Sequence, residues 1–277
     1  MPELAEVEFF RKRWHQAAVG QTVTDVSIHE RARVFVNQRA ALAVRKALPG
    51  RTLLGSEAAA KQMCFRFSDD LWLGVHLGMS GELRVEPAGY VPQKHDHMVL
   101  HTAGHALVFT DPRMFGGVEL HCGPEAPAWW ARIAPSLLSP AFTVEAVAAF
   151  LRRRARAPIK AVLLMQERFP GIGNWMADEI LWRAAIHPRQ PAGSLRAAEV
   201  RVLWRECRRV CRLALATIAG RGDYLPTSLN AHIPASWLFL HRWTDGGRCP
   251  KTRRPLCRET VGGRTSCWSP ARQKLHR

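Results

Sequence analysis

The sequence predicts an α+β protein, with an antiparallel, mainly β part first, then a helical part, then a short β-hairpin. Between residues 22 and 111, short apolar-rich runs are separated by Gly, Pro and Asp turns, which is typical of antiparallel strands. From residue 143 onward, apolar residues recur at helical spacing instead. Near the carboxyl end, a Gly-Gly pair suits the turn of a hairpin.

The first predicted element is a helix over "ELAEVEFFRKRWHQAAVG", which has apolar residues at helical spacing and ends at Gly20. Its acidic first turns, with Pro2 before them, suit the positive end of a helix. The same stretch has a second interpretation, because removal of Met1 would expose a secondary amine at Pro2 beside the carboxyl groups of Glu3 and Glu6. The spacing alone does not distinguish the two interpretations.

Strands are predicted next, in a mainly β domain that extends to about residue 120. Their sequences are "TVTDVSI", "RTLLGSE", "MCFRFS", "LWLGVHL", "ELRVEP", "MVLHT" and "ALVFTD". The composition then changes, since "CGPEAPAWWARIAPSLLSP" is rich in proline and predicts a linker. Strong helices are predicted over 143–167 and 194–220, the second capped by Ser194.

Composition indicates a folded globular protein with a polyanionic partner. The chain has 277 residues, 47% of them hydrophobic, and ten tryptophans. Forty Lys and Arg against 23 Asp and Glu give a net charge of +17, which favours DNA or RNA over an anionic membrane. No apolar run reaches the roughly 18 residues of a membrane span, and no signal segment is recognised, so we expect a cytoplasmic protein.

The seven cysteines contain no C-x-x-C pair, and their odd number argues against a disulfide framework. Cys207 and Cys211 lie one helical turn apart and would suit either half of a metal site or two small buried residues; we favour burial. The stretch "RCPKTRRPLCRETVGGRTSCWSPARQ" has the rhythm of a zinc ribbon without its ligands, because Thr252, Ser269 and Arg272 stand where paired cysteines would be. No metal is therefore expected.

Two kinds of glycine motif indicate contact with nucleic acid. "PGIGN" places backbone amides and Asn174 at the start of a helix, which suits either a phosphate site or a tight helical hairpin. The loops "HLGMSG" and "TDPRMFGG" display Met79, Arg113 and Phe115. Met79 and Phe115 are either core residues or apolar wedges that, next to Arg113, fill the gap left by an extruded base.

Six motifs follow one another along the chain: "PELAEVE", "HLGMSG", "KHDH", "TDPRMFG", "GIGN" with "IHP", and "GGRTSCWSPARQ". This order resembles the formamidopyrimidine-DNA glycosylase family (Fpg/MutM/Nei) from residue 2 to about 273, and the opening is more similar to the Fpg branch. The resemblance implies an N-terminal β-sandwich flanked by helices at 1–120, a linker at 121–140, a helix-two-turn-helix domain at 141–236 and a zincless β-hairpin finger at 237–277.

The resemblance also implies an activity: a bifunctional DNA N-glycosylase and AP lyase that excises oxidised or ring-opened bases and cleaves the abasic site by β,δ-elimination. Pro2 would be the Schiff-base nucleophile, since an α-amino group titrates at about 7.7–8.0, well below lysine. Glu3 would act as acid and base, Glu6 would support it, Lys61 would serve β-elimination and Arg264 δ-elimination. The implied DNA contacts are Met79, His95, Arg113, Phe115, Arg156, Lys160 and Asn174.

The implied partner is double-stranded DNA with damaged bases or abasic sites, bound by a monomer without a cofactor and associated with the bacterial nucleoid. Ala5 replaces a proline that is usual in the family. The segment "GRGDYLPTSLNAHIPASWLFLHRW" is shorter than its Fpg counterpart, so recognition of 8-oxoguanine is not expected, while ring-opened purines, oxidised pyrimidines and hydantoins stay open. Two alternatives are a non-catalytic damaged-DNA-binding protein on the same scaffold and an RNA-binding protein.

Overall fold

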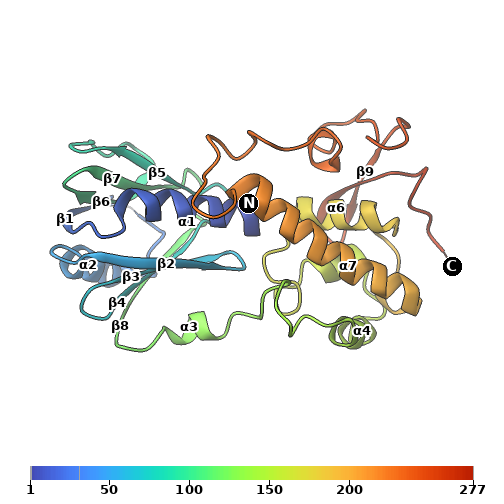
Figure 1. The fold of residues 1–277 in the computed structure, drawn as a ribbon, viewed down its shortest axis with the longest axis horizontal. Helices are drawn as coiled ribbons and strands as arrows, with labels where there is room; N and C mark the ends of the chain where they lie inside the picture. The colour runs from blue at the N-terminus through green and yellow to red at the C-terminus, as the bar shows by residue number, and fades with distance from the viewer. Residues whose placement is uncertain (1, 31, 277) are drawn as a thin grey trace. The chain divides into compact units, whose positions relative to one another are not determined.

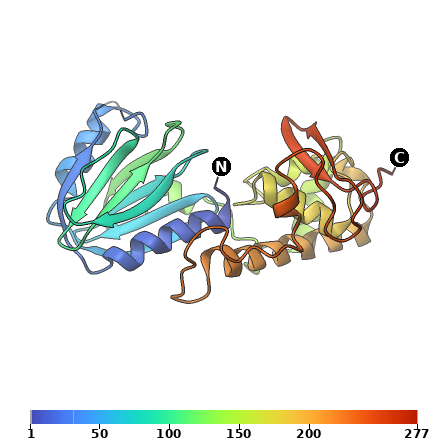
Figure 2. The ribbon, with the colours of Figure 1, turned by 90° about the horizontal axis from the view of Figure 1, so that it is seen from above.

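The computed structural model describes residues 2–30 and 32–276, which form two compact units. The first unit contains residues 1–133 together with 223–225, and the second contains 134–222 and 226–277 (Figures 1 and 2). Most of the predicted linker therefore packs with the β part, and the predicted finger packs with the helical part instead of forming a unit of its own.

The first unit is built on two four-stranded antiparallel sheets. One has the strand order β1-β6-β7-β5 and the other β2-β3-β4-β8. The strands are β1 (Val23–Ile28), β2 (Leu53–Ala59), β3 (Gln62–Phe67), β4 (Leu71–His76), β5 (Glu82–Pro87), β6 (Asp96–Thr102), β7 (His105–Thr110) and β8 (Gly117–Cys122). Helix α1 (Leu4–Ala18) lies between the two sheets (Figure 1) and contacts β5 and β7 of one sheet and β2 and β3 of the other.

Helix α1 joins the two sheets through its buried face. The Trp14 ring lies 5.2 Å from the ring of Phe65 on β3, while its indole N–H donates to the Arg84 carbonyl on β5 at 2.9 Å. On the helix surface Arg11 pairs with Glu8 at 2.7 Å and donates to Ser56 Oγ on β2 at 2.9 Å. These contacts fix the direction in which the start of the helix points, which matters because Pro2 precedes it.

Two short helices of this unit were not predicted. Helix α2 (Gln38–Ala47) is capped by Asn37, whose side chain accepts a hydrogen bond from Ala40 N at 2.9 Å. Helix α3 (Ala128–Ala131) places the Trp129 ring against Gly74 on β4, where a Cβ would lie 2.4 Å from the ring. The glycine in β4 is therefore required for the indole to approach the sheet.

The second unit is helical, with a two-stranded hairpin. Its elements are α4 (Val144–Arg153), α5 (Ile159–Leu163), α6 (Asn174–Ala184), the short helix η1 (Ala192–Ser194), α7 (Ala197–Ala214), the π-helical turn η2 (Leu215–Ala219), η3 (Leu238–His241), and strands β9 (Cys257–Val261) and β10 (Arg264–Trp268). The helix predicted over 143–167 is divided before Pro158, as expected of a residue that cannot continue a helix.

The predicted cap of the long helix is corrected by the structure. Ser194 ends η1, and its hydroxyl donates to the Pro191 carbonyl at 2.9 Å. Helix α7 begins three residues later, after Arg196, whose backbone N–H donates to Glu199 at 2.8 Å. Cys207 and Cys211 are fully buried on this helix, and burial raises the pKa of both thiols, that of Cys211 to about 12. They pack as small apolar residues.

The hairpin turns at Gly262 and Gly263, both with positive φ, as the Gly-Gly pair predicts. Its base does not fit zinc, because three of the four ligand positions hold Thr252, Ser269 and Arg272. At the fourth, the Cys249 thiol is buried and accepts a hydrogen bond from the Trp182 indole at 3.3 Å. The Arg272 guanidinium lies over the same indole, 5.4 Å from its centre, so a tryptophan and a cation occupy the base of the hairpin.

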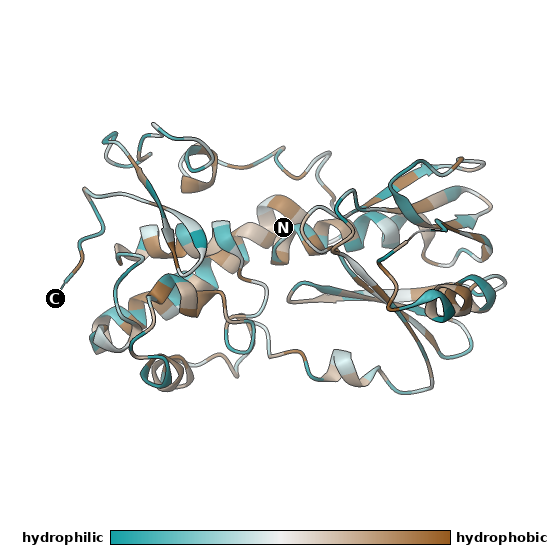
Figure 3. Cartoon of the chain, turned by 180° about the vertical axis from the view of Figure 1, so that it is seen from behind, coloured by the Kyte–Doolittle hydropathy of each residue, from teal (hydrophilic) through white to brown (hydrophobic). Residues whose placement is uncertain are grey.

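The helices of both units mix hydrophilic and hydrophobic residues along their lengths (Figure 3). Among the described residues, none of the helices combines the length and the apolar character needed to cross a membrane.

Candidate functional site

The amino-terminal site of the first unit begins with Pro2 and Glu3, directly before α1. Glu3 is only 2% exposed, and its backbone N–H donates to Glu6 Oε2 at 3.2 Å. Glu6 therefore stabilises the helix start while it holds the segment that carries Pro2 and Glu3. The helix-start interpretation of the sequence and the nucleophile interpretation are compatible, since one arrangement serves both. Met1 lies outside the described residues.

Lys61 lies in the tight turn between β2 and β3, after Ala60 with φ 55°. Burial and the positive charge of Lys61 both lower the pKa of His76 at the end of β4, so this ring is neutral near pH 7. His76 Nδ1 accepts the Gly78 N–H at 3.1 Å, which leaves its proton on Nε2 as a donor. Lys61 and His76 thus form a pair that can donate to an anion. His76 was not predicted, although it stands in "HLGMSG".

The two glycine-bounded loops meet around one buried carboxylate, Asp111, which has no exposed surface. Its Oδ1 accepts from the Ser80 hydroxyl at 2.6 Å, which ties the loop of Met79 to that of Arg113. Its Oδ2 accepts the Gly116 N–H at 2.7 Å, which closes the second loop. The loops that carry the predicted wedge residues are therefore brought together, and Asp111 is the group that joins them.

The side chains of these loops are presented outward. Phe115 is 57% exposed, Arg113 is exposed with its guanidinium 5.1 Å from the Phe115 ring centre, and Met79 is half-buried. An exposed phenylalanine ring on a tightly fixed loop does not contribute apolar burial to the core. Its exposure favours the wedge interpretation over the core interpretation for Phe115.

We expect Gly78→Ala to displace the second loop. Gly78 has φ +60°, and a Cβ there would lie 2.3 Å from the Phe115 backbone carbon. The left-handed backbone alone should lower the free energy of unfolding by about 1–3 kcal/mol. The steric clash should add a loss of DNA binding. Thermal unfolding and DNA titration measure the two effects.

Gly89→Ala is the matched control, because Gly89 also has a positive φ, +82°, but nothing lies within 4 Å of an added Cβ. It should cost stability without weakening DNA binding. Equal binding losses in the two variants would contradict the steric explanation.

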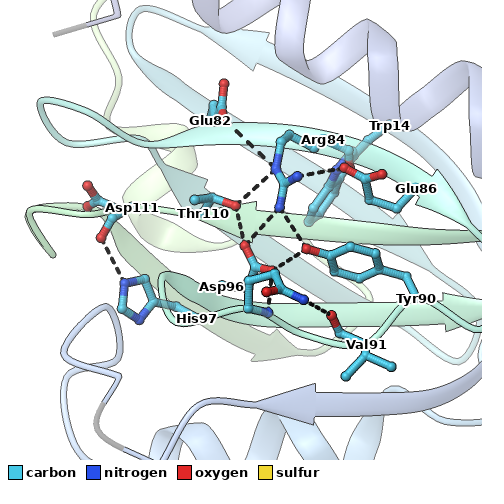
Figure 4. A network of polar contacts seen from close by, with 11 residues as sticks. Trp14, Glu82, Arg84, Glu86, Tyr90, Val91, Asp96, His97, Thr110 and Asp111 are labelled. Carbon is cyan, nitrogen blue, oxygen red and sulfur yellow. Dashed lines mark hydrogen bonds and ion pairs between the residues drawn. The ribbon is translucent and has the colours of Figure 1, made fainter.

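The "KHDH" motif divides into two exposed residues, Lys94 and His95, and two buried ones, Asp96 and His97. Figure 4 shows the contacts of the two buried residues. Asp96 is buried and accepts hydrogen bonds from Thr110 at 2.5 Å, Tyr90 at 2.7 Å, Gln93 N at 2.8 Å and Arg84 at 2.9 Å. Burial by itself would raise the pKa of this carboxyl, but these bonds hold it below its usual value. Asp96 therefore fixes the turn that ends at His95.

His97 connects the same motif to the wedge loop. Its Nε2 makes a 2.8 Å hydrogen bond with the Asp111 carbonyl, as Figure 4 shows, and the Asp111 N–H donates to the His95 carbonyl at 3.0 Å. The exposed side chain of His95 is thus held beside the loop of Arg113 and Phe115. The loops that carry the predicted DNA contacts of the first unit are therefore held by one hydrogen-bond network, formed by Asp96, His97 and Asp111.

In the second unit, Asn174 is the first residue of α6, as "PGIGN" predicts. Its Nδ2 donates to the Thr265 carbonyl at 2.9 Å, which places the helix start beside β10. Arg264, the neighbour of Thr265, is exposed at the first position of β10. The structure therefore brings together the start of the helix and the hairpin arginine.

The two remaining predicted DNA contacts have different surroundings. Arg156 is exposed in the turn between α4 and α5, where a phosphate contact is possible. Lys160 has no exposed surface, and its ammonium donates to Asp178 at 2.5 Å and to the Asn174 carbonyl at 2.7 Å. A wholly buried ammonium offers nothing to DNA, so the structure corrects the assignment of Lys160 from a DNA contact to a group within the fold.

Two family profiles match this chain. The formamidopyrimidine-DNA glycosylase N-terminal domain matches residues 1–118, and the formamidopyrimidine-DNA glycosylase H2TH domain matches residues 133–222. The chain belongs to the formamidopyrimidine-DNA glycosylase family. The resemblance of the sequence motifs is thereby confirmed, and so is the predicted fold class, because the β-sandwich, the helix-two-turn-helix region and the hairpin are all present.

Relatives match over nearly the whole chain. The formamidopyrimidine-DNA glycosylase of Roseiflexus sp. is 41% identical over 99% of this chain and 100% of its own, and that of Ligilactobacillus salivarius is 34% identical over 98% of each. A point mutant of the Lactococcus lactis Fpg bound to DNA containing Fapy-dG has a TM-score of 0.86 and 26% identity, with 99% and 100% of the two chains covered. The wild-type Lactococcus lactis enzyme bound to DNA with an oxidised pyrimidine gives a TM-score of 0.85.

Proposed function

We propose that this protein is a base-excision DNA repair glycosylase that removes oxidised or ring-opened bases and then cleaves the abasic strand. The observation that carries the proposal is the arrangement at the start of α1, where Pro2 directly precedes a buried Glu3 whose backbone is held by Glu6. Membership of the formamidopyrimidine-DNA glycosylase family supports the glycosylase activity. Damaged DNA is the substrate, as in the DNA complexes of the Lactococcus lactis enzyme.

The chemistry starts with the secondary amine of Pro2, once Met1 is removed. The nitrogen lone pair bonds to the sugar C1′, the glycosidic bond breaks, and the base leaves with its bonding electrons and a proton. The nitrogen then loses its proton, and its lone pair forms the C=N bond of the iminium as the C1′–O4′ bond breaks and O4′ takes up a proton. Glu3, a buried carboxyl beside this nitrogen in sequence, is the group we assign to these proton transfers.

Strand cleavage follows from the iminium, which acidifies the adjacent sugar carbon. Removal of a C2′ proton expels the 3′ phosphate in β-elimination, and a second elimination expels the 5′ phosphate. We assign Lys61 to the first elimination and Arg264 to the second. His76, a neutral donor beside Lys61, would bind a phosphate oxygen with it, which its Nε2 proton and lowered pKa support. Asn174 at the start of α6 would bind another phosphate.

Met79, Arg113 and Phe115 would fill the space left by the extruded nucleotide. Their loops are fixed by Asp111, so they need no ordering when DNA binds. Two exposed groups, His95 and Arg156, would contact the phosphate backbone. Ring-opened purines and oxidised pyrimidines are the lesions we place first.

Borohydride trapping tests the proposal, because the iminium to Pro2 is reducible to a stable covalent bond. Protein that begins at Pro2, verified by intact mass, is incubated with an abasic-site duplex and borohydride. We expect a covalent protein–DNA adduct. The same protein with Met1 retained should give none, since its Pro2 nitrogen is an amide and has no nucleophilic lone pair. Peptide mapping of the adduct should locate the bond at Pro2.

The Pro2→Gly variant keeps an amine at the same position in the chain but removes the proline ring. Its primary amine should give an altered trapping rate, whereas an adduct that forms unchanged would show that another amine reacts. If the protein beginning at Pro2 binds abasic DNA tightly but forms no adduct and excises no base, the non-catalytic damaged-DNA-binding alternative is correct instead.

A further inference from the structure

A buried ionic cluster lies inside the second unit, centred on Asp178 of α6. The Asp178 side chain is 1% exposed, and its Oδ1 accepts from Lys160 Nζ at 2.5 Å. Its Oδ2 accepts from Arg242 Nη2 at 2.6 Å and from the Cys267 backbone N–H on β10 at 2.9 Å. One carboxylate thus connects α5, α6, the segment after η3, and the hairpin.

The cluster touches the two elements that carry Asn174 and Arg264, to which the proposed function assigns a phosphate contact and the second elimination. The Lys160 ammonium also donates to the Asn174 carbonyl at 2.7 Å, at the first turn of α6. Asn174 in turn donates to the Thr265 carbonyl at 2.9 Å. Thr265 lies between Arg264 and Cys267 on β10. The Asn174 amide therefore holds this strand at Thr265, and the Asp178 carboxylate holds it at Cys267.

The hairpin turn is packed against the same region. A Cβ on Gly262 would lie 2.6 Å from the Cβ of Ala161, the residue after Lys160 on α5. The turn residue two positions before Arg264 is therefore in contact with the helix that supplies the ammonium. A shift of α5 or of Lys160 would move the position of Arg264.

The base of the hairpin does not provide a metal cross-link, since Cys249 is there hydrogen-bonded to Trp182 and the other ligand positions are not metal ligands. A buried ion pair adds little stability compared with apolar residues of the same volume, but removal of one partner is strongly unfavourable. What distinguishes a buried ion pair from an apolar contact is that it fixes the geometry of the groups that it joins.

We propose that Asp178 is a positioning residue, which through Lys160, Arg242 and the Cys267 amide holds Asn174 and Arg264 in the mutual arrangement that phosphate binding and the second elimination require. This inference rests on the proposed function of those two residues. Asp178 itself touches neither substrate nor reacting atoms, because it is buried.

The Asp178→Asn variant tests the inference with the ratio of elimination products. It keeps an oxygen for the Cys267 N–H but removes the charge that pairs with two cations. With saturating abasic DNA, trapping at Pro2 should stay within about threefold, because Pro2 belongs to the first unit. The share of δ-elimination product should fall about tenfold, and the Kd for abasic DNA should rise about tenfold, as for the loss of one charge-assisted contact.

Glu179→Gln is the matched control. Glu179 follows Asp178 in sequence and is equally buried, but it pairs with Arg183 at 2.7 Å and accepts from Phe239 N. Its replacement should lower the melting temperature and leave the product ratio unchanged. If Asp178→Asn fails to fold, Arg242→Gln gives the second test, because it leaves the Asp178–Lys160 pair balanced; it should reduce the δ-product share at least about twofold.

The outcomes separate this inference from the proposed function. If the unmodified protein forms no adduct, the proposed function fails and the variants are not informative about chemistry. If it forms the adduct and both products, an unchanged ratio in folded Asp178→Asn or folded Arg242→Gln overturns the inference. So does a uniform fall of trapping and both eliminations in proportion to the folded fraction, which is the result of a merely structural role.

Discussion

Glu3→Gln should lower the rate of base excision by about 10²- to 10⁴-fold, the usual contribution of a general acid–base group. The amide cannot donate or accept the proton that moves with the departing base. Because the carboxyl is buried, water does not replace it readily. Single-turnover excision from a duplex with one ring-opened purine measures the effect, with enzyme in excess so that product release does not limit the rate.

Glu8→Gln is the control, since Glu8 lies on the same helix but pairs with Arg11 at 2.7 Å. It removes the same chemical group from the first turns of α1, so its effect on excision should stay within about twofold, as for loss of a surface ion pair. The melting temperature of each variant shows whether the helix start is intact. Comparable losses from Glu3→Gln and Glu8→Gln would mean that helix charge, not proton transfer, is being measured.

Sequence patterns located most of the fold because its main elements are locally determined. The first helix and seven of the strands are close to their predicted ranges, since helical spacing marks the helix and apolar-rich runs between turn residues mark the strands. Helix α2 buries only Val44, so its periodicity carries little signal. The prediction of one helix over 143–167 was wrong, because proline disfavours helical backbone at the residue before it and the chain leaves the helix ahead of Pro158.

The exposed groups of the candidate site could be predicted, whereas the buried groups that hold them could not. Arg113, Phe115 and Arg264 stand in glycine-bounded motifs, and glycine turns mark where a side chain is presented. Asp111, Asp96 and Asp178 are buried carboxylates whose function depends on donors up to 89 residues away in sequence. No local sequence pattern predicts hydrogen bonds between residues so far apart in the sequence. Lys160 was misassigned for the same reason, because a lysine next to arginines in sequence gives no sign of a buried partner.

Asp96→Asn should lower the free energy of unfolding by about 2–4 kcal/mol near pH 7. Four donors converge on this carboxylate, and an amide of the same shape would turn an N–H₂ group toward some of them. Arg84 would keep Glu86 at 2.6 Å, which limits the loss. Glu86→Gln is the control; it removes a partly exposed partner of the same arginine and should cost no more than about 1 kcal/mol.

The effect of Asp96 should disappear in acid. Its folded-state pKa is below the usual value of 3.8, so its stabilising contribution is fully present above the unfolded-state pKa and is lost as the pH falls through the folded-state pKa. The melting temperatures of the unmodified protein and of Asp96→Asn should therefore differ by a constant amount from pH 7 to about 5 and converge below about pH 4. Circular dichroism melts across this range measure the convergence. A difference that persists unchanged at pH 2.5 would show that the shape of the side chain, not its charge, holds the His95 turn.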